Sequence, residues 1–212
     1  MNNYIQSLVD SKKLKKSIEP NRWKFDSNPY IISGPCSVES EEMIVDWAHK
    51  MKNSGVNALR GGAYKPCTYP ITEEIGKNGW KEGLREDGLK FLKTAREETG
   101  LPIVSEIMDS NQITESTMDC IDIVQVGTRN FQNYTLLDAL GELDIPILLK
   151  RGTWGTIDEI LGAVERILVG GNEKVAICLR GVVGAPSYRH VFPSIRWAPD
   201  LMMIPALKEL CD

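Results

Sequence analysis

Two short segments in the first third of the chain carry residue types that could bind a small, highly charged anion. Residues 33–37 (SGPCS) contain a thiol, and residues 59–66 (LRGGAYKP), one helix length later, contain a guanidinium and an ammonium. Each segment follows a short apolar run, so both mark the ends of expected strands. The cations Arg60 and Lys65 suit a phosphorylated carboxylate. The thiol of Cys36 is a soft ligand, which suggests a divalent metal nearby.

Further charged side chains stand at or just after later apolar runs, namely Glu106, Arg129, Lys150 and Arg180. Taken singly, an Arg or Lys at a strand end is most often part of a surface ion pair. Together with Arg60 and Lys65, the cations Arg129, Lys150 and Arg180 make five at successive strand ends. Five such cations favour a shared anion site over separate ion pairs. Lys150 follows Ile-Leu-Leu, which places a charge directly above an apolar interior, and such a charge is unfavourable unless an anion meets it.

Apolar runs alternate with segments of helical periodicity along most of the chain. We expect strands at residues 30–33, 56–59, 102–106, 121–126, 146–150 and 174–179. We expect helices at residues 41–53, 84–99, 134–140, 156–169 and 198–210, with one more starting near residue 110. Gly100 supplies a helix stop, and Thr156 with Glu159 forms a capping box. Strands separated by helices pair in parallel through right-handed crossovers.

The strand spacing suits either a doubly wound sheet or a (β/α)₈ barrel. The first strand-to-helix turn is not G-x-G-x-x-G, and no phosphate-binding P-loop pattern occurs, so a nucleotide-binding sheet is unsupported. The candidate residues ring one mouth only in a barrel. We therefore predict an α/β fold of the TIM type, with about six of the eight βα units present. Residues 1–29 form an N-terminal extension, and residues 30–212 form the barrel catalytic domain.

Composition excludes several classes of partner. The formal charge of −4 and the pI near 5.4 argue against nucleic acid or an anionic membrane. No apolar stretch reaches the roughly 18 residues of a membrane span, and no signal peptide is apparent. Five cysteines without a C-x-x-C pair indicate a reducing compartment, most simply the cytoplasm.

Five segments in order carry a family resemblance: GPCSVES (34–40), LRGGAYKP (59–66), QVGTRNFQN (125–133), ILLKRG (147–152) and LRG (179–181). Together they resemble class I 3-deoxy-D-arabino-heptulosonate 7-phosphate (DAHP) synthases. The resemblance implies a (β/α)₈ barrel and an aldolase-like transferase that condenses phosphoenolpyruvate (PEP) with erythrose 4-phosphate, releasing phosphate. This is the first step of the shikimate pathway to aromatic amino acids. The related 3-deoxy-D-manno-octulosonate 8-phosphate synthases share the barrel and the reaction type, but LRGGAYKP is closer to the DAHP branch.

The resemblance also implies a role for each candidate residue. PEP would be bound by Arg60, Lys65, Gly127, Thr128, Arg129, Lys150 and Arg180. The catalytic set would be Lys65, Arg60 and Glu106, with Glu106 as a partner of Lys65 or Arg60; an ion pair without catalytic role is the alternative for Glu106. Cys36 would ligate a divalent metal (Mn²⁺, Fe²⁺, Zn²⁺ or Co²⁺) that polarises the aldehyde. Thr68 would contact the acceptor.

The chain departs from the family pattern in two places. Cys67 stands where the family has an arginine that binds the acceptor phosphate, and a neutral thiol cannot replace a guanidinium. The identity of the acceptor aldehyde is therefore undecided unless Arg151 or Arg189 binds that phosphate. The family's later metal-binding histidine, glutamate and aspartate find no counterpart, and His190 is more simply an ordinary loop histidine. Three explanations are open: the chain is a fragment of a longer enzyme, its barrel is completed by a partner subunit, or it is a shortened relative. We also expect a homo-oligomer. The alternatives are a catalytically impaired PEP-binding module and a related 3-deoxy-ulosonate synthase with another aldehyde.

Overall fold

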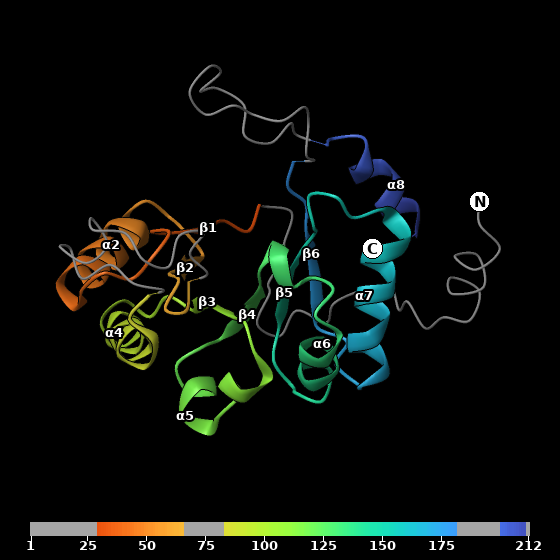
Figure 1. The fold of residues 1–212 in the computed structure, drawn as a ribbon. Helices are drawn as coiled ribbons and strands as arrows, with labels where there is room; N and C mark the ends of the chain where they lie inside the picture. The colour runs from red at the N-terminus through yellow and green to blue at the C-terminus, as the bar shows by residue number, and fades with distance from the viewer. Residues whose placement is uncertain (1–28, 66–82, 182–199, 211–212) are drawn as a thin grey trace, which may run out of the picture. The chain divides into compact units, whose positions relative to one another are not determined.

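The computed structural model describes residues 29–65, 83–181 and 200–210 (Figure 1). The described residues divide into two compact units, an N-terminal unit up to residue 125 and a C-terminal unit from residue 126 onward. The expected N-terminal extension lies almost entirely outside the described residues, so its boundary at residue 29 remains a prediction.

The described strands form one sheet, and their order in the sheet follows their order in the chain. They are β1 (Ile32–Ser33), β2 (Ala58–Arg60), β3 (Ile103–Ile107), β4 (Ile123–Val126), β5 (Ile147–Lys150) and β6 (Val175–Cys178). The pairs β1–β2, β2–β3 and β5–β6 are parallel, with Ile32 opposite Ala58, Leu59 opposite Ile103, and Ile147 opposite Val175. Parallel strands in sequential order, joined by helices, confirm the α/β fold and match six successive units of a TIM-type barrel.

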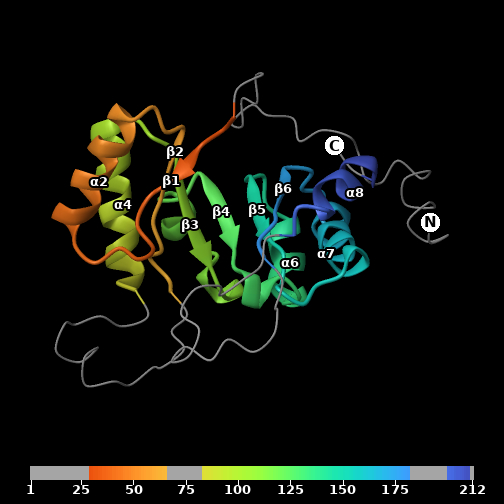
Figure 2. The same ribbon diagram turned by 90° about the horizontal axis from the view of Figure 1, so that it is seen from above.

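Helices α2 (Glu41–Asn53) and α4 (Arg85–Thr99) pack side by side in the N-terminal unit (Figure 2). The Ser40 side chain caps α2 by accepting a hydrogen bond from the Met43 amide, and Gly100 ends α4 in the left-handed conformation. The packing brings Leu92 so close to β2 that a Cβ at Gly61 would lie 2.8 Å from the Leu92 Cδ2 atom. The glycine after Arg60 therefore lets α4 approach the strand closely.

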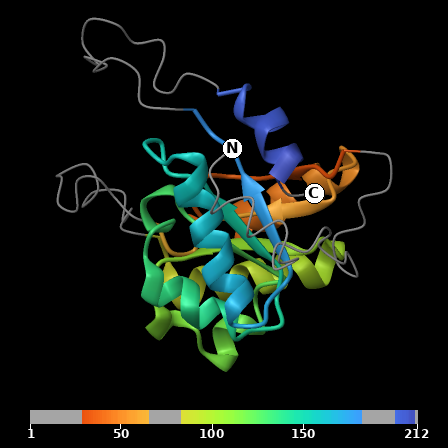
Figure 3. The same ribbon diagram turned by 90° about the vertical axis from the view of Figure 1, so that its right-hand side faces the viewer.

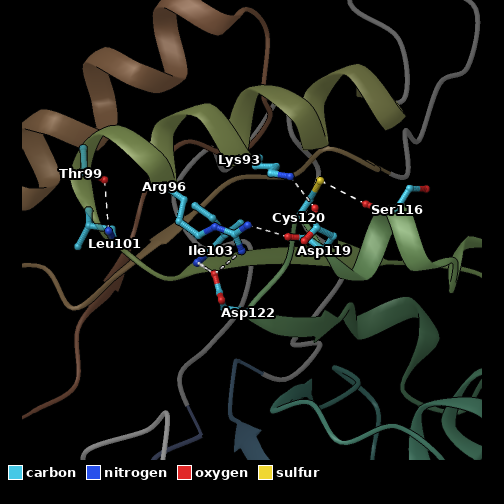
Figure 4. Close-up of polar contacts among 9 residues, drawn as sticks. All are labelled: Lys93, Arg96, Thr99, Leu101, Ile103, Ser116, Asp119, Cys120 and Asp122. Carbon is cyan, nitrogen blue, oxygen red and sulfur yellow. Dashed lines mark hydrogen bonds and ion pairs between the residues drawn. The ribbon is translucent and has the colours of Figure 1, made fainter.

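Polar contacts fasten α4 to the starts of β3 and β4 (Figure 4). Arg96 pairs with the Asp122 carboxylate at 3.2 Å and donates to the Asp119 carbonyl at 2.7 Å. Asp122 also accepts from the Ile103 amide at 2.9 Å, and Lys93 pairs with the Asp119 carboxylate at 2.6 Å. These contacts lie at the amino ends of the strands, so they stabilise the fold at the end away from the candidate site.

Helices α6 (Tyr134–Gly141) and α7 (Ile157–Val169) lie side by side in the C-terminal unit, which ends in α8 (Met203–Leu210) (Figure 3). The predicted capping box is confirmed, since Thr156 and Glu159 exchange both hydrogen bonds at the start of α7. Two glycines allow the helices to touch, because a Cβ at Gly170 would lie 2.5 Å from the Gly141 carbonyl carbon.

Two helical predictions were wrong in extent. The helix expected near residue 110 is a 3₁₀ turn, η1 (Ser110–Gln112), followed by the short α5 (Glu115–Met118). Asp109 caps the first piece and Thr114 caps the second, so each capping side chain starts a new turn instead of extending one helix. The helix expected at residues 198–210 begins only at Met203 among the described residues.

Candidate functional site

The two segments that carry Cys36 and Arg60 pack against each other through their backbones. A Cβ at Gly34, whose φ is +150°, would lie 2.1 Å from the Arg60 carbonyl oxygen. The Val38 amide donates to the Gly62 carbonyl at 3.0 Å, and the Arg60 guanidinium donates to the Pro35 carbonyl at 3.2 Å. Glycine is required at position 34, and a Cβ at Gly62 would lie 2.7 Å from the Cys36 carbonyl oxygen, so glycines in both SGPCS and LRGG permit this approach.

This packing brings the Cys36 thiol to the Lys65 ammonium, with Lys65 Nζ 2.7 Å from Cys36 Sγ. Cys36 is exposed. Partial burial opposes ionisation of the thiol, but the hydrogen bond and charge of Lys65, together with Arg60, outweigh it and lower the pKa of Cys36. Cys36, Arg60 and Lys65, predicted to act together, therefore share one electropositive corner of the N-terminal unit.

Residues on either side of segment 66–82 are held together. The Arg85 amide donates to the Ala63 carbonyl at 3.0 Å, and the buried Tyr64 hydroxyl donates to the Glu86 carboxylate at 3.0 Å. Gly83 has φ +80°, and a Cβ there would lie 1.9 Å from the Ala63 carbonyl oxygen. Burial and the Glu86 carboxylate raise the pKa of Tyr64, so the phenol stays protonated and keeps donating. These contacts fix the backbone on which Lys65 sits.

Thr68, the predicted acceptor-binding residue, lies outside the described residues, as do Cys67, Arg189 and His190.

Glu106, in β3, is buried and accepts a hydrogen bond from the side-chain amide of Gln125 at 3.0 Å. Gln125, in β4, is equally buried. The pairing of Glu106 with Lys65 or Arg60 remains a prediction. Sequence reasoning missed Gln125 as a partner of Glu106, although Gln125 opens the segment QVGTRNFQN and is a polar residue inside an apolar strand.

The C-terminal unit carries the remaining predicted PEP-binding residues at its strand ends. Gly127 follows β4 and caps η2 (Thr128–Asn130), which contains Thr128 and Arg129. Lys150 is the last residue of β5, and Arg180 follows β6. The Arg180 guanidinium donates to the Thr128 hydroxyl at 2.9 Å, which joins the ends of β4 and β6.

Arg151 is not available in the role considered for it. Its side chain is only 6% exposed and pairs with Asp200 at 2.7 Å, while its Nε donates to the Gly155 carbonyl at 2.8 Å. The adjoining turn packs on the fully buried Phe131, whose ring a Cβ at Gly152 would approach to 2.1 Å. Arg151 thus forms a buried ion pair that stabilises the C-terminal unit. The structure does not support Arg151 as the replacement for the family's arginine that binds the acceptor phosphate.

The structure thus brings together Cys36, Arg60 and Lys65 in the N-terminal unit, and Thr128 and Arg180 in the C-terminal unit. That both groups contact one ligand remains a prediction. Among the described residues no group of three or more His, Cys, Asp and Glu side chains could hold a metal ion. Cys36 offers one thiolate ligand, so the described residues do not by themselves fit a metal centre. None of the described helices is both long and apolar enough to cross a membrane.

Comparison with known proteins decides the family. The model of the DAHP synthetase I family matches residues 22–202. The chain belongs to this family. It is 41% identical over 152 residues to the phospho-2-dehydro-3-deoxyheptonate aldolase of Thermotoga maritima, which covers 72% of this chain and 42% of that protein. It is 27% identical over 151 residues to the 2-dehydro-3-deoxyphosphooctonate aldolase of Syntrophotalea carbinolica, covering 71% of this chain and 54% of that protein.

Solved structures of family members share the fold. A crystal structure of the Thermotoga maritima DAHP synthase superposes with a TM-score of 0.76 at 34% identity, covering 92% of this chain and 52% of that one. A truncated form of the enzyme from the same organism superposes with a TM-score of 0.68, covering 84% of this chain and 59% of that one. The chain spans about half the length of these relatives.

Proposed function

We propose that this chain carries out, or forms part of an enzyme that carries out, the aldol-type condensation of PEP with a phosphorylated aldose, erythrose 4-phosphate, with release of phosphate. The enzyme would be a transferase of the DAHP synthase type, at the first step of the shikimate pathway. The observation that carries the proposal is the position of basic side chains in or just after β2, β4, β5 and β6 in a chain of this family.

The residues proposed to bind PEP are basic side chains and backbone groups in or just after the strands. Lys150 and Arg180, with Arg129 and the backbone at Gly127 and Thr128, would bind the anionic groups of PEP through charge-assisted hydrogen bonds. Arg60 and Lys65 belong to the same proposed set of PEP-binding residues. Cations arranged before the reaction stabilise negative charge that develops during it without further reorganisation.

The proposed catalytic set is Lys65, Arg60 and Glu106. Lys65 lies against Cys36, and Glu106 is kept in place by the Gln125 amide. Cys36 would contribute one thiolate to a divalent metal, whose chemistry is to polarise an aldehyde carbonyl when bound. Thr68 would contact the acceptor. We further propose a cytoplasmic homo-oligomer in which residues 1–29 extend a barrel domain formed by residues 30–212.

A catalytically impaired PEP-binding module is the second candidate, favoured by the lack of a metal-ligand cluster among the described residues. A 3-deoxy-ulosonate synthase using another aldehyde is consistent with the more distant octonate aldolase relatives. Purified chain incubated with PEP, Mn²⁺ and a panel of aldehydes separates the three. Phosphate release with erythrose 4-phosphate supports the first, release only with another aldehyde supports the third, and PEP binding without release supports the module.

The PEP site itself is tested by calorimetry. Lys150→Ala and Arg180→Ala should each weaken PEP binding by about 1.5–3 kcal/mol, the usual contribution of a hydrogen bond to a charged group. Lys174→Ala is the matched control, because Lys174 precedes β6 at its other end and pairs with Asp144. The control should bind PEP like the parent chain. No PEP binding by the parent chain would reject the proposed function.

A further inference from the structure

Arg180 and Thr128 are joined by a side-chain hydrogen bond within the C-terminal unit. Arg180 donates from its NH1 atom to the Thr128 Oγ1 atom at 2.9 Å across 52 residues of sequence. A hydroxyl oxygen accepts a hydrogen bond from a guanidinium without itself carrying a negative charge.

Thr128 is suited to orient a flexible partner because it is held firmly itself. Thr128 is only 8% exposed, and it lies in η2 directly after β4. A β-branched side chain has few χ1 rotamers, so the threonine hydroxyl is restricted to a small number of positions. An arginine loses much rotamer freedom when it is immobilised. If the arginine side chain is already restricted before an anion binds, the entropic cost of ordering it on binding is smaller.

We propose that Thr128 is a positioning residue whose side-chain hydroxyl holds the Arg180 guanidinium in the orientation that binds a phosphate or carboxylate group. This role is separate from the backbone contact expected of Thr128. It rests on the proposed function, since the anion in question is PEP. The hydroxyl acts only through Arg180, which makes the proposal testable by coupling the two positions.

Three variants at residue 128 isolate the hydroxyl. Thr128→Val keeps the shape and removes the acceptor, Thr128→Ser keeps the acceptor, and Thr128→Ala removes both shape and acceptor. We expect Thr128→Val and Thr128→Ala to weaken PEP binding by about 5- to 30-fold, or about 1–2 kcal/mol. This is less than the direct loss of a hydrogen bond to a charged group, because the hydroxyl acts on PEP only through Arg180. Thr128→Ser should remain within about 3-fold of the parent, well short of the tenfold that 1.4 kcal/mol represents. Rescue by serine separates positioning from packing.

The same change in an Arg180→Ala background provides the decisive comparison. If Thr128 acts through Arg180, Thr128→Val causes no further loss of PEP affinity there. An unchanged dissociation constant for Thr128→Val in the parent background would overturn the inference, and so would an equal loss in both backgrounds. Melting temperatures measured alongside show whether each variant is folded.

A ligand-free measurement keeps the inference distinguishable from the proposed function. Phenylglyoxal labels arginine side chains, and peptide mass spectrometry reports the rate at Arg180 alone. Loss of the hydroxyl should speed labelling of Arg180 in Thr128→Val and leave it unchanged in Thr128→Ser. If the parent chain fails to bind PEP, the proposed function fails. Equal labelling of Arg180 in the parent and Thr128→Val would then still overturn the positioning role.

Discussion

Substitution of Asp200 by Ala should strongly destabilise the C-terminal unit. Asp200 pairs at 2.7 Å with Arg151, whose side chain is 6% exposed, while that of Asp200 is 23% exposed. Removal of one partner of a buried ion pair costs about 3–5 kcal/mol, because the other charge remains buried without compensation. Water reaches the Asp200 side of the pair, and the Gly155 carbonyl still accepts from Arg151 at 2.8 Å. We therefore expect a loss near the lower limit, about 3 kcal/mol.

Urea denaturation followed by circular dichroism measures this loss. Asp200→Asn should lose less stability, because the amide oxygen can still accept from the guanidinium and only the charge is removed. Asp138→Ala is the matched control. Asp138 binds Arg166 at 2.9 Å and 2.7 Å, but both side chains are about half exposed, so its midpoint should stay close to that of the parent. Equal midpoints for Asp200→Ala and Asp138→Ala would show that burial does not decide the contribution of these pairs.

Three further outcomes follow from the packing and the charges. Gly152→Ala should destabilise the chain by about 1–3 kcal/mol, because its Cβ would overlap the Phe131 ring. The same change should cost less stability in a Phe131→Leu background. If urea titrations show that the losses from the two substitutions simply add, the clash is contradicted. Cys36 should be alkylated by iodoacetamide faster than the buried Cys120, whose pKa is raised by burial and nearby Asp119. Lys65→Ala should slow the reaction at Cys36 near neutral pH, since loss of the ammonium raises its pKa and lowers the thiolate fraction; an unchanged rate, read by mass spectrometry, would refute this.

The sequence predicted the order of elements well, because apolar runs of strand length alternate with segments of helical period. Element boundaries were less accurate. The first strand, expected at residues 30–33, is reduced to Ile32–Ser33, and the helix expected near residue 110 is divided by the caps Asp109 and Thr114. Capping side chains compete locally with helix extension, and this competition is not visible in hydrophobic periodicity.

The candidate residues could be named from motifs, but their partners could not. Lys65 meets Cys36, and Glu106 meets Gln125. Such pairs depend on how neighbouring strands are aligned and on which rotamers the surrounding packing allows. Arg151 shows the same limit most clearly, because its partner Asp200 is 49 residues away. An unpaired cation and an internal ion pair look identical in sequence.

The joined base of segment 66–82 has a consequence for how the chain can vary. The Ala63 carbonyl accepts a hydrogen bond from the Arg85 amide, and Gly83 packs closely against the same carbonyl. Both β2 and α4 are thus tied to each other by residues that flank the segment. Closing a loop twice as long adds only about 0.6 kcal/mol of entropic penalty. A longer connection between Thr68 and Gly83 should therefore cost the fold little, because the contacts that join β2 to α4 would stay in place.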